Sequence, residues 1–95
     1  MPEDFTKDAM KVLDALYKEY LAKRLNNQND RDAMNLRGAR HLQEMYFESE
    51  TIERVNKWCC ELERDGYLQN VYDGGLAIAC VLTDKSTVYM ESIRA

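Results

Sequence analysis

The stretch that decides the fold is LERDGYLQNVYDGGLAIACVLTDKS, residues 62–86, where the spacing of apolar residues changes from helical to strand-like. A helical pattern runs up to Gly66, and glycine readily takes the left-handed backbone that commonly ends a helix. Beyond it, residues on both sides of Asp73 and Gly74 have strand character, and Asp-Gly tolerates the positive φ angles of a tight turn. The stretch therefore predicts a helix followed at once by a two-stranded hairpin.

The returning strand of this hairpin, residues 76–82, is apolar on both faces. Side chains alternate between the two faces of a strand, so every second residue shares an environment. The face expected to point into the core carries Leu76, Ile78, Cys80 and Leu82. The other face carries the smaller residues Ala77, Ala79 and Val81. Such a face would suit a neighbour lying close against it.

Three helical segments precede the hairpin, and the first is the most regular. Either Asp4 or Thr6 can cap it, and Lys23 and Arg24 suit the negative end of its dipole. Its apolar residues form two neighbouring ridges. The ridge expected to face the core consists of Ala9, Val12, Leu13, Leu16 and Tyr20. A second ridge, available to a partner, consists of Met10, Tyr17 and Leu21.

The next segments are shorter. Residues 26–30 are a polar loop, and residues 32–36 fit either a short strand or the approach to the next helix. We expect a second helix over 37–46, with Leu42 and Met45 facing inward.

A third helix starts at Ser49 or Glu50 and ends at Gly66. Its core stripe, bordered by Trp58, consists of Ile52, Val55, Cys59 and Leu62. After the hairpin, Thr83 with Asp84 can cap a final helix. The residues of that helix available for burial are Val88, Tyr89 and Ile93.

Two motifs resemble a known pattern. The string V-x-x-x-C-x-x-L-E-x-D-G-Y-L at 55–68, with L-T-D-K-S-x-x-Y-M at 82–90, resembles the recognition-helix and wing segments of bacterial winged helix-turn-helix proteins. Ser86 stands where that pattern usually has glycine. The layout is also similar to small winged-helix proteins of mobile elements, the YjcQ-like group. The resemblance implies one α+β winged-helix domain over 1–95, with three helices, a two-stranded wing and a short C-terminal helix.

Charge is distributed unevenly along the chain. The net charge is −4, which argues against strong non-specific binding of polyanions. Residues 18–40 nevertheless contain six basic and three acidic side chains. Arg31, Arg37 and Arg40 lie at or before the second helix, where they can contact phosphates. Alternatively, these arginines pair with neighbouring carboxylates, namely those of Asp30, Asp32 or Glu44.

The resemblance places the outer face of the third helix in the major groove of DNA. The candidate base contacts on that face are Thr51, Arg54, Asn56 and Lys57. Residues 50–65 also contain five acidic groups against three basic ones, so the face can equally be a solvated surface of mixed charge. The DGG turn, residues 73–75, carries no cation for a minor groove.

No pattern of catalytic or metal-binding residues is found in the sequence. His41 is the single histidine, and we expect a surface or half-buried imidazole. Cys59 and Cys80 fall on core positions and should pack as reduced hydrophobic residues, whereas Cys60 lies off the stripe. No apolar run has the length of a membrane span. We expect a cytoplasmic protein without cofactors or enzymatic activity.

The sequence thus predicts a small protein that binds double-stranded DNA as a transcriptional regulator or a mobile-element accessory factor. A homodimer through the first and last helices would cover their surplus apolar surface and double a weak phosphate footprint. The alternative is a protein-interaction module whose acidic third helix docks a partner protein.

Overall fold

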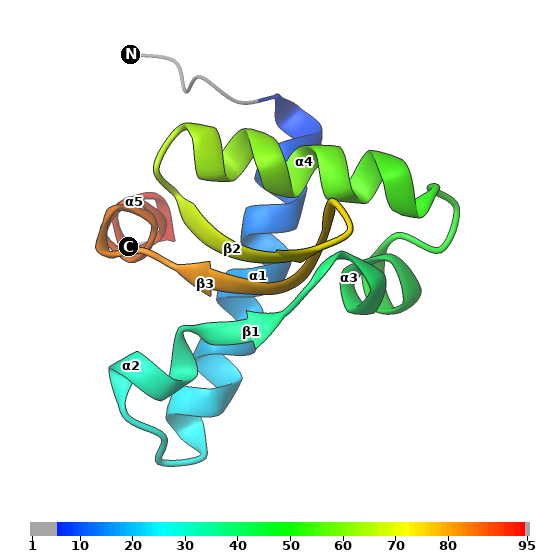
Figure 1. The fold of residues 1–95 in the computed structure, drawn as a ribbon. Coiled ribbons are helices and arrows are strands. Elements are labelled where there is room, and N and C mark those ends of the chain that lie inside the picture. Colours follow the sequence, from blue (N-terminus) through cyan, green and yellow to red (C-terminus); the bar gives the residue numbers. More distant parts are fainter. Residues whose placement is uncertain (1–5, 95) are drawn as a thin grey trace.

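The computed structural model describes residues 6–94, which form five helices around a three-stranded antiparallel sheet (Figure 1). The elements in chain order are α1 (Lys7–Leu25), α2 (Asp30–Ala33), β1 (Asn35–Arg37), α3 (Ala39–Tyr46), α4 (Ile52–Arg64), β2 (Leu68–Asp73), β3 (Leu76–Leu82) and α5 (Asp84–Arg94). The α+β class is therefore confirmed. In Figure 1, α1 runs behind the sheet and α4 lies across the hairpin of β2 and β3.

Helix α1 is the central helix of the core. The Thr6 hydroxyl caps it by accepting a hydrogen bond from the Ala9 amide at 3.1 Å, while the alternative cap, Asp4, lies outside the described residues. The predicted core ridge is buried throughout. Tyr17 of the second ridge is also buried, and Met10 and Leu21 pack partly against the core. The expectation of a ridge available to a partner was wrong for Tyr17, whereas Met10 and Leu21 remain partly exposed.

The ambiguous segment 32–36 contributes to two elements. The short helix α2 ends at Ala33, and β1 then pairs with β3, with Leu36 opposite Cys80. The strand order is β1-β3-β2, so the expected two-stranded hairpin is a three-stranded sheet with β3 in its centre. β1 has three residues, of which only Leu36 is buried. A strand this short has too few residues to show an alternation of apolar and polar side chains in the sequence.

Strand β3 contains an irregularity that the sequence pattern did not reveal. Val71 pairs with Ala79 and Tyr72 with Ala77, so Ile78 has no partner in this register. Such a bulge shifts the alternation of side chains by one residue. Ala77 is consequently buried, whereas Ile78 is 52% exposed. The prediction that Ile78 shares the inward face of Cys80 was therefore wrong.

Helices α3 and α4 begin later than predicted. α3 begins at Ala39 and does not bury Met45, which is 62% exposed. Phe47, just beyond the helix, packs against the core instead, and the centroid of its ring lies 5.7 Å from that of the Trp58 ring. α4 begins at Ile52, and its stripe is buried at Val55, Trp58, Cys59 and Leu62 and partly buried at Ile52. Gly66, with φ of 87°, follows this helix as expected.

Helix α5 is held by a reciprocal cap. The Thr83 amide donates to Ser86 Oγ at 3.0 Å, and the Ser86 amide donates to Thr83 Oγ1 at 3.3 Å. Ser86 and Met90 lie one turn apart and are fully buried. The sequence pattern offered Val88 and Ile93 for burial, but both are exposed, because this cap directs Ser86 and Met90 inward.

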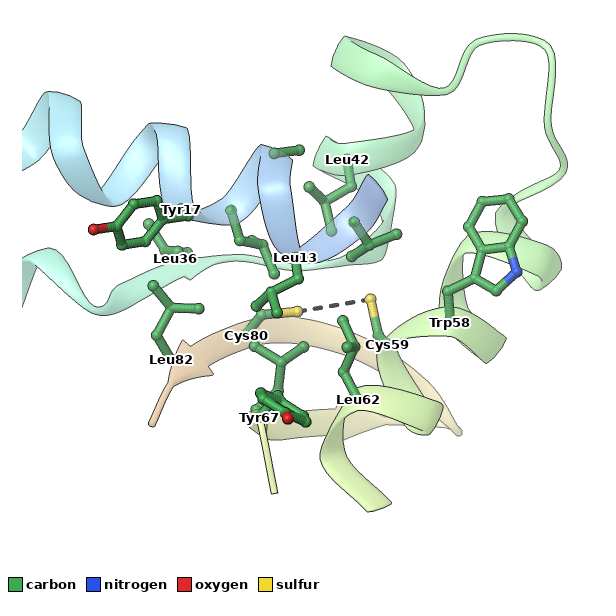
Figure 2. Close-up of a cluster of buried hydrophobic side chains, with 14 of the residues drawn as sticks. Leu13, Tyr17, Leu36, Leu42, Trp58, Cys59, Leu62, Tyr67, Cys80 and Leu82 are labelled. Atoms are coloured by element: carbon green, nitrogen blue, oxygen red, sulfur yellow. Dashed lines mark hydrogen bonds between the residues drawn. The ribbon is translucent and has the colours of Figure 1, made fainter. Parts of the chain in front are cut away.

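Figure 2 shows the core where these elements meet. Leu13 of α1, Leu62 of α4 and Leu82 of β3 are all buried there. The sulfur atoms of Cys59 and Cys80 are in contact at its centre, 3.8 Å apart (Figure 2).

Candidate nucleic-acid interface

Two shallow grooves adjoin on one surface of the molecule, which we call the α3–hairpin surface. The first, about 350 Å³, is lined by Arg37, Gly38, Arg40, His41, Glu44, Leu76, Ala77 and Ile78. The second, about 360 Å³, is lined by Arg40, Ile52, Glu53, Asn56, Gly74, Gly75 and Leu76. Arg40 and Leu76 line both grooves. The surface therefore combines the start of α3, the start of α4 and the hairpin turn.

Gly38 fixes the position of α3 against the sheet. A Cβ atom at this residue would lie 2.1 Å from the carbonyl oxygen of Ala77 and 2.5 Å from the carbonyl carbon of Ile78. Both contacts are with backbone, so only glycine permits this approach. Arg37 at the end of β1 and Arg40 in the first turn of α3 flank Gly38 and line the same groove.

Two of the three predicted phosphate-binding arginines are brought together. Arg37 and Arg40 are exposed and form no ion pair within residues 6–94. Arg31 is also exposed, but it lies on α2, which is separated from α3 by β1 (Figure 1). The alternative in which Asp30, Asp32 or Glu44 neutralises these arginines was wrong, because none of these carboxylates forms an ion pair with them within the described residues. The Asp30 carboxylate instead pairs with Arg24 at 3.1 Å and accepts from the Tyr20 hydroxyl.

The predicted base-contacting residues of α4 have different roles. Thr51 is the N-cap and accepts a hydrogen bond from the Arg54 amide at 3.2 Å. The Arg54 guanidinium pairs with Glu50 at 3.3 Å and lies 5.5 Å from the centroid of the Trp58 ring. Lys57 is exposed and makes no ion pair within the described chain. Of these three, Lys57 is thus the one whose charge is free for a partner.

Asn56 holds the hairpin instead of pointing freely outward. Its Nδ2 donates to the Gly75 carbonyl at 2.9 Å, and its Oδ1 accepts from the Ala77 amide at 2.8 Å. These bonds occupy the donor and acceptor that bidentate adenine recognition requires. Asn56 therefore positions the turn relative to α4. Its partners lie 19 and 21 residues away, which is why the sequence did not reveal this role.

A second polar contact joins the same helix to β2. The Tyr72 hydroxyl donates to Glu63 Oε1 at 2.5 Å, and the backbone N–H of Asn70 donates to Glu63 Oε2 at 3.0 Å. Burial raises the pKa of Tyr72, and its hydrogen bonds to Cys60 and Glu63 raise the pKa further. Both oxygens of the Glu63 carboxylate are therefore engaged in holding the hairpin against α4.

His41, which lines the first groove, belongs to a small polar cluster. Its Nε2 lies 2.7 Å from Glu19 Oε2, and the Tyr46 hydroxyl donates to the same oxygen at 2.8 Å. Burial, followed by this hydrogen bond and the Glu19 charge, raises the pKa of Tyr46 to about 12. The cluster ties α3 to α1. Within residues 6–94, no three His, Cys, Asp or Glu side chains are grouped so that they could hold a metal ion.

None of the helices described between residues 6 and 94 combines the length and apolar character needed to cross a membrane. Comparison with protein-family models, with curated proteins and with solved structures finds no match for this chain. The functional proposal consequently depends on the geometry of the α3–hairpin surface.

Proposed function

We propose that the chain is a winged helix-turn-helix domain that binds double-stranded DNA. The support for this architecture is the order of elements: α3 and α4 are joined by residues 47–51, and the hairpin of β2 and β3 follows α4 directly. The two hydrogen bonds of Asn56 hold the hairpin turn beside the N-terminal half of α4. In this arrangement α4 is the recognition helix and the hairpin is the wing.

The observation that carries DNA binding is that Arg37 and Arg40, which form no ion pair within residues 6–94, line one groove, and that Arg40 also lines the adjoining groove beside α4 and the turn. A phosphate group is the ligand that best matches exposed guanidinium groups on a groove wall. Lys57, on the exposed face of α4, supplies a third cation. Arg31 would contact the backbone only if the duplex extended toward α2.

This footprint is small, and the affinity should be correspondingly low. Three phosphate contacts give a slope of log affinity against log salt of about −3, because each contact contributes about −0.9. The hairpin tip has two glycines and no cation, so it adds little. We propose that the protein acts as a homodimer, which doubles the footprint. The exposed Val88 and Ile93 on α5 support this, whereas the second ridge of α1 offers less surface because Tyr17 is buried.

A transcriptional regulator or mobile-element accessory factor is the role that fits such a domain. Fluorescence anisotropy with a random-sequence duplex of about 20 base pairs, titrated between low and moderate salt, tests it. We expect binding at low salt, with a flatter slope in the Arg37→Ala/Arg40→Ala double variant. Lys18→Ala is the control, because Lys18 pairs with Asp14 on α1. Absence of binding at low salt would refute the proposal.

The second candidate is a protein-docking module, favoured by the acidic side chains on α4. Glu53 is exposed and Glu61 partly exposed, and neither forms an ion pair within the described residues. A basic partner protein would complement this face. Under this alternative, Glu53→Gln/Glu61→Gln weakens partner binding, whereas loss of Arg37 and Arg40 does not. If the DNA proposal is correct, the same glutamine substitutions strengthen duplex binding by removing repulsion.

A further inference from the structure

Two buried thiols meet at the junction of the recognition-helix candidate and the sheet. Cys80 Sγ donates to Cys59 Sγ across 3.8 Å, and neither residue is exposed (Figure 2). Cys59 belongs to α4 and Cys80 to the central strand β3. The adjacent Cys60 is turned away, and its sulfur accepts a hydrogen bond from the Tyr72 hydroxyl at 3.4 Å. The contact thus involves one specific pair of the three cysteines.

The backbone around this pair is held in place on both sides. Cys80 pairs with Leu36 of β1 and with Asn70 of β2. The Asn70 side chain also donates to the carbonyl of Cys59 at 3.0 Å, which ties α4 to the sheet next to the sulfur atoms. A disulfide has an S–S bond of about 2.05 Å, so the sulfurs have about 1.8 Å to close. Closing this gap requires rotation of the two side chains together with a small shift of α4 against the sheet.

We propose that Cys59 and Cys80 form a reversible disulfide that fastens α4 to β3 when the protein meets a peroxide. One thiolate attacks the O–O bond of hydrogen peroxide, which gives a sulfenic acid and, after protonation, water. The second sulfur then displaces the sulfenic oxygen as water and forms the S–S bond. Two thiols and one hydrogen peroxide therefore yield one disulfide and two water molecules. A dithiol reductant reverses the step by exchange.

Burial makes this reaction slow. The neighbouring Cys80 sulfur and burial both raise the pKa of Cys59, so little of its thiolate forms at neutral pH. Formation of the Cys59–Cys80 disulfide does not depend on the proposed function. An effect of this disulfide on DNA affinity would depend on it.

The test uses the Cys60→Ala variant of the full chain, which retains only the buried pair. The folded variant is incubated with hydrogen peroxide, unfolded and alkylated with N-ethylmaleimide. We expect no alkylation and a cross-linked peptide joining residues 59 and 80, with a mass two hydrogens below the sum of the two separate peptides. Dithiothreitol should restore two alkylation sites. Two free thiols, sulfinic acids or disulfide-linked dimers in the peroxide-treated, natively folded variant would overturn the proposal. No DNA is present, so failure of DNA binding leaves this test unaffected.

Discussion

Replacing Gly38 by alanine perturbs the contact that positions α3 on the sheet. The new Cβ would lie 2.1 Å from the Ala77 carbonyl oxygen, which is 1.3 Å inside the 3.4 Å lower limit of ordinary contact. The φ of −90° at Gly38 suits any residue, so the penalty is steric and not conformational. Because both obstructing groups are backbone, α3 or β3 must move. Overpacking of this kind costs about 3 kcal/mol of unfolding free energy.

Thermal and urea unfolding followed by circular dichroism measure this cost. A loss of about 3 kcal/mol in a domain of this size lowers Tm by roughly 10–25 °C. Gly74→Ala is the matched control: its Cβ meets nothing within 4 Å, but its φ of 59° should cost about 1 kcal/mol. The reasoning is refuted if Gly38→Ala unfolds within 0.5 kcal/mol of the parent protein, a threshold set by ordinary surface substitutions.

Three further substitutions test individual contacts. Asn56→Ala should lose about 1–3 kcal/mol in urea unfolding and speed hydrogen exchange at the Ala77 amide; unchanged exchange there would contradict the hairpin role. Ser86→Ala should cost about 1 kcal/mol by the same assay, because it removes one half of the cap with Thr83. The pKa of Tyr46 is about 12 in the folded protein, above the ordinary value of 10.0. The neutral hydroxyl therefore stabilises the fold fully below pH 10, and this stabilisation is lost as the pH rises through 12. Tyr46→Phe should flatten the fall in unfolding free energy between pH 10 and 12, and an unchanged fall would assign it to other tyrosines.

The long periodic elements were predictable, and the reason is physical. α1 and α4 repeat their apolar residues over several turns, and each repeat reinforces the same face. Gly66, Gly74 and Gly75 adopt positive φ angles that few other residues accept, although the sequence pattern had assigned the turn to Asp73 and Gly74. These local signals located the change from helix to hairpin within one or two residues of the observed boundaries.

The missed features depend on tertiary contacts. β1 is a strand because β3 pairs with it, and its three residues contain no period of their own. The bulge at Ile78 was hidden because β3 is apolar on both faces, so either alternation fits the sequence. Met45 and Phe47 are both apolar, and the end of α3 decides which of them packs inward.

The candidate site was predictable in part. Arg37 and Arg40 stood out through local charge, and the structure places them in one groove. Arg31 carries the same charge but lies on α2. The roles of Thr51 as a cap and of Asn56 as a hairpin contact follow from the exact start of α4 and from the fold, neither of which composition reveals.

NMR chemical-shift mapping tests most directly whether the α3–hairpin surface binds DNA. The amide resonances of ¹⁵N-labelled protein are followed as a duplex is added at low salt. If this surface binds DNA, we expect the shifts to concentrate at residues 37–40, at the start of α4 and at Gly74 and Gly75. Unchanged spectra at a saturating duplex concentration, or shifts confined to α1 and α5, would contradict it.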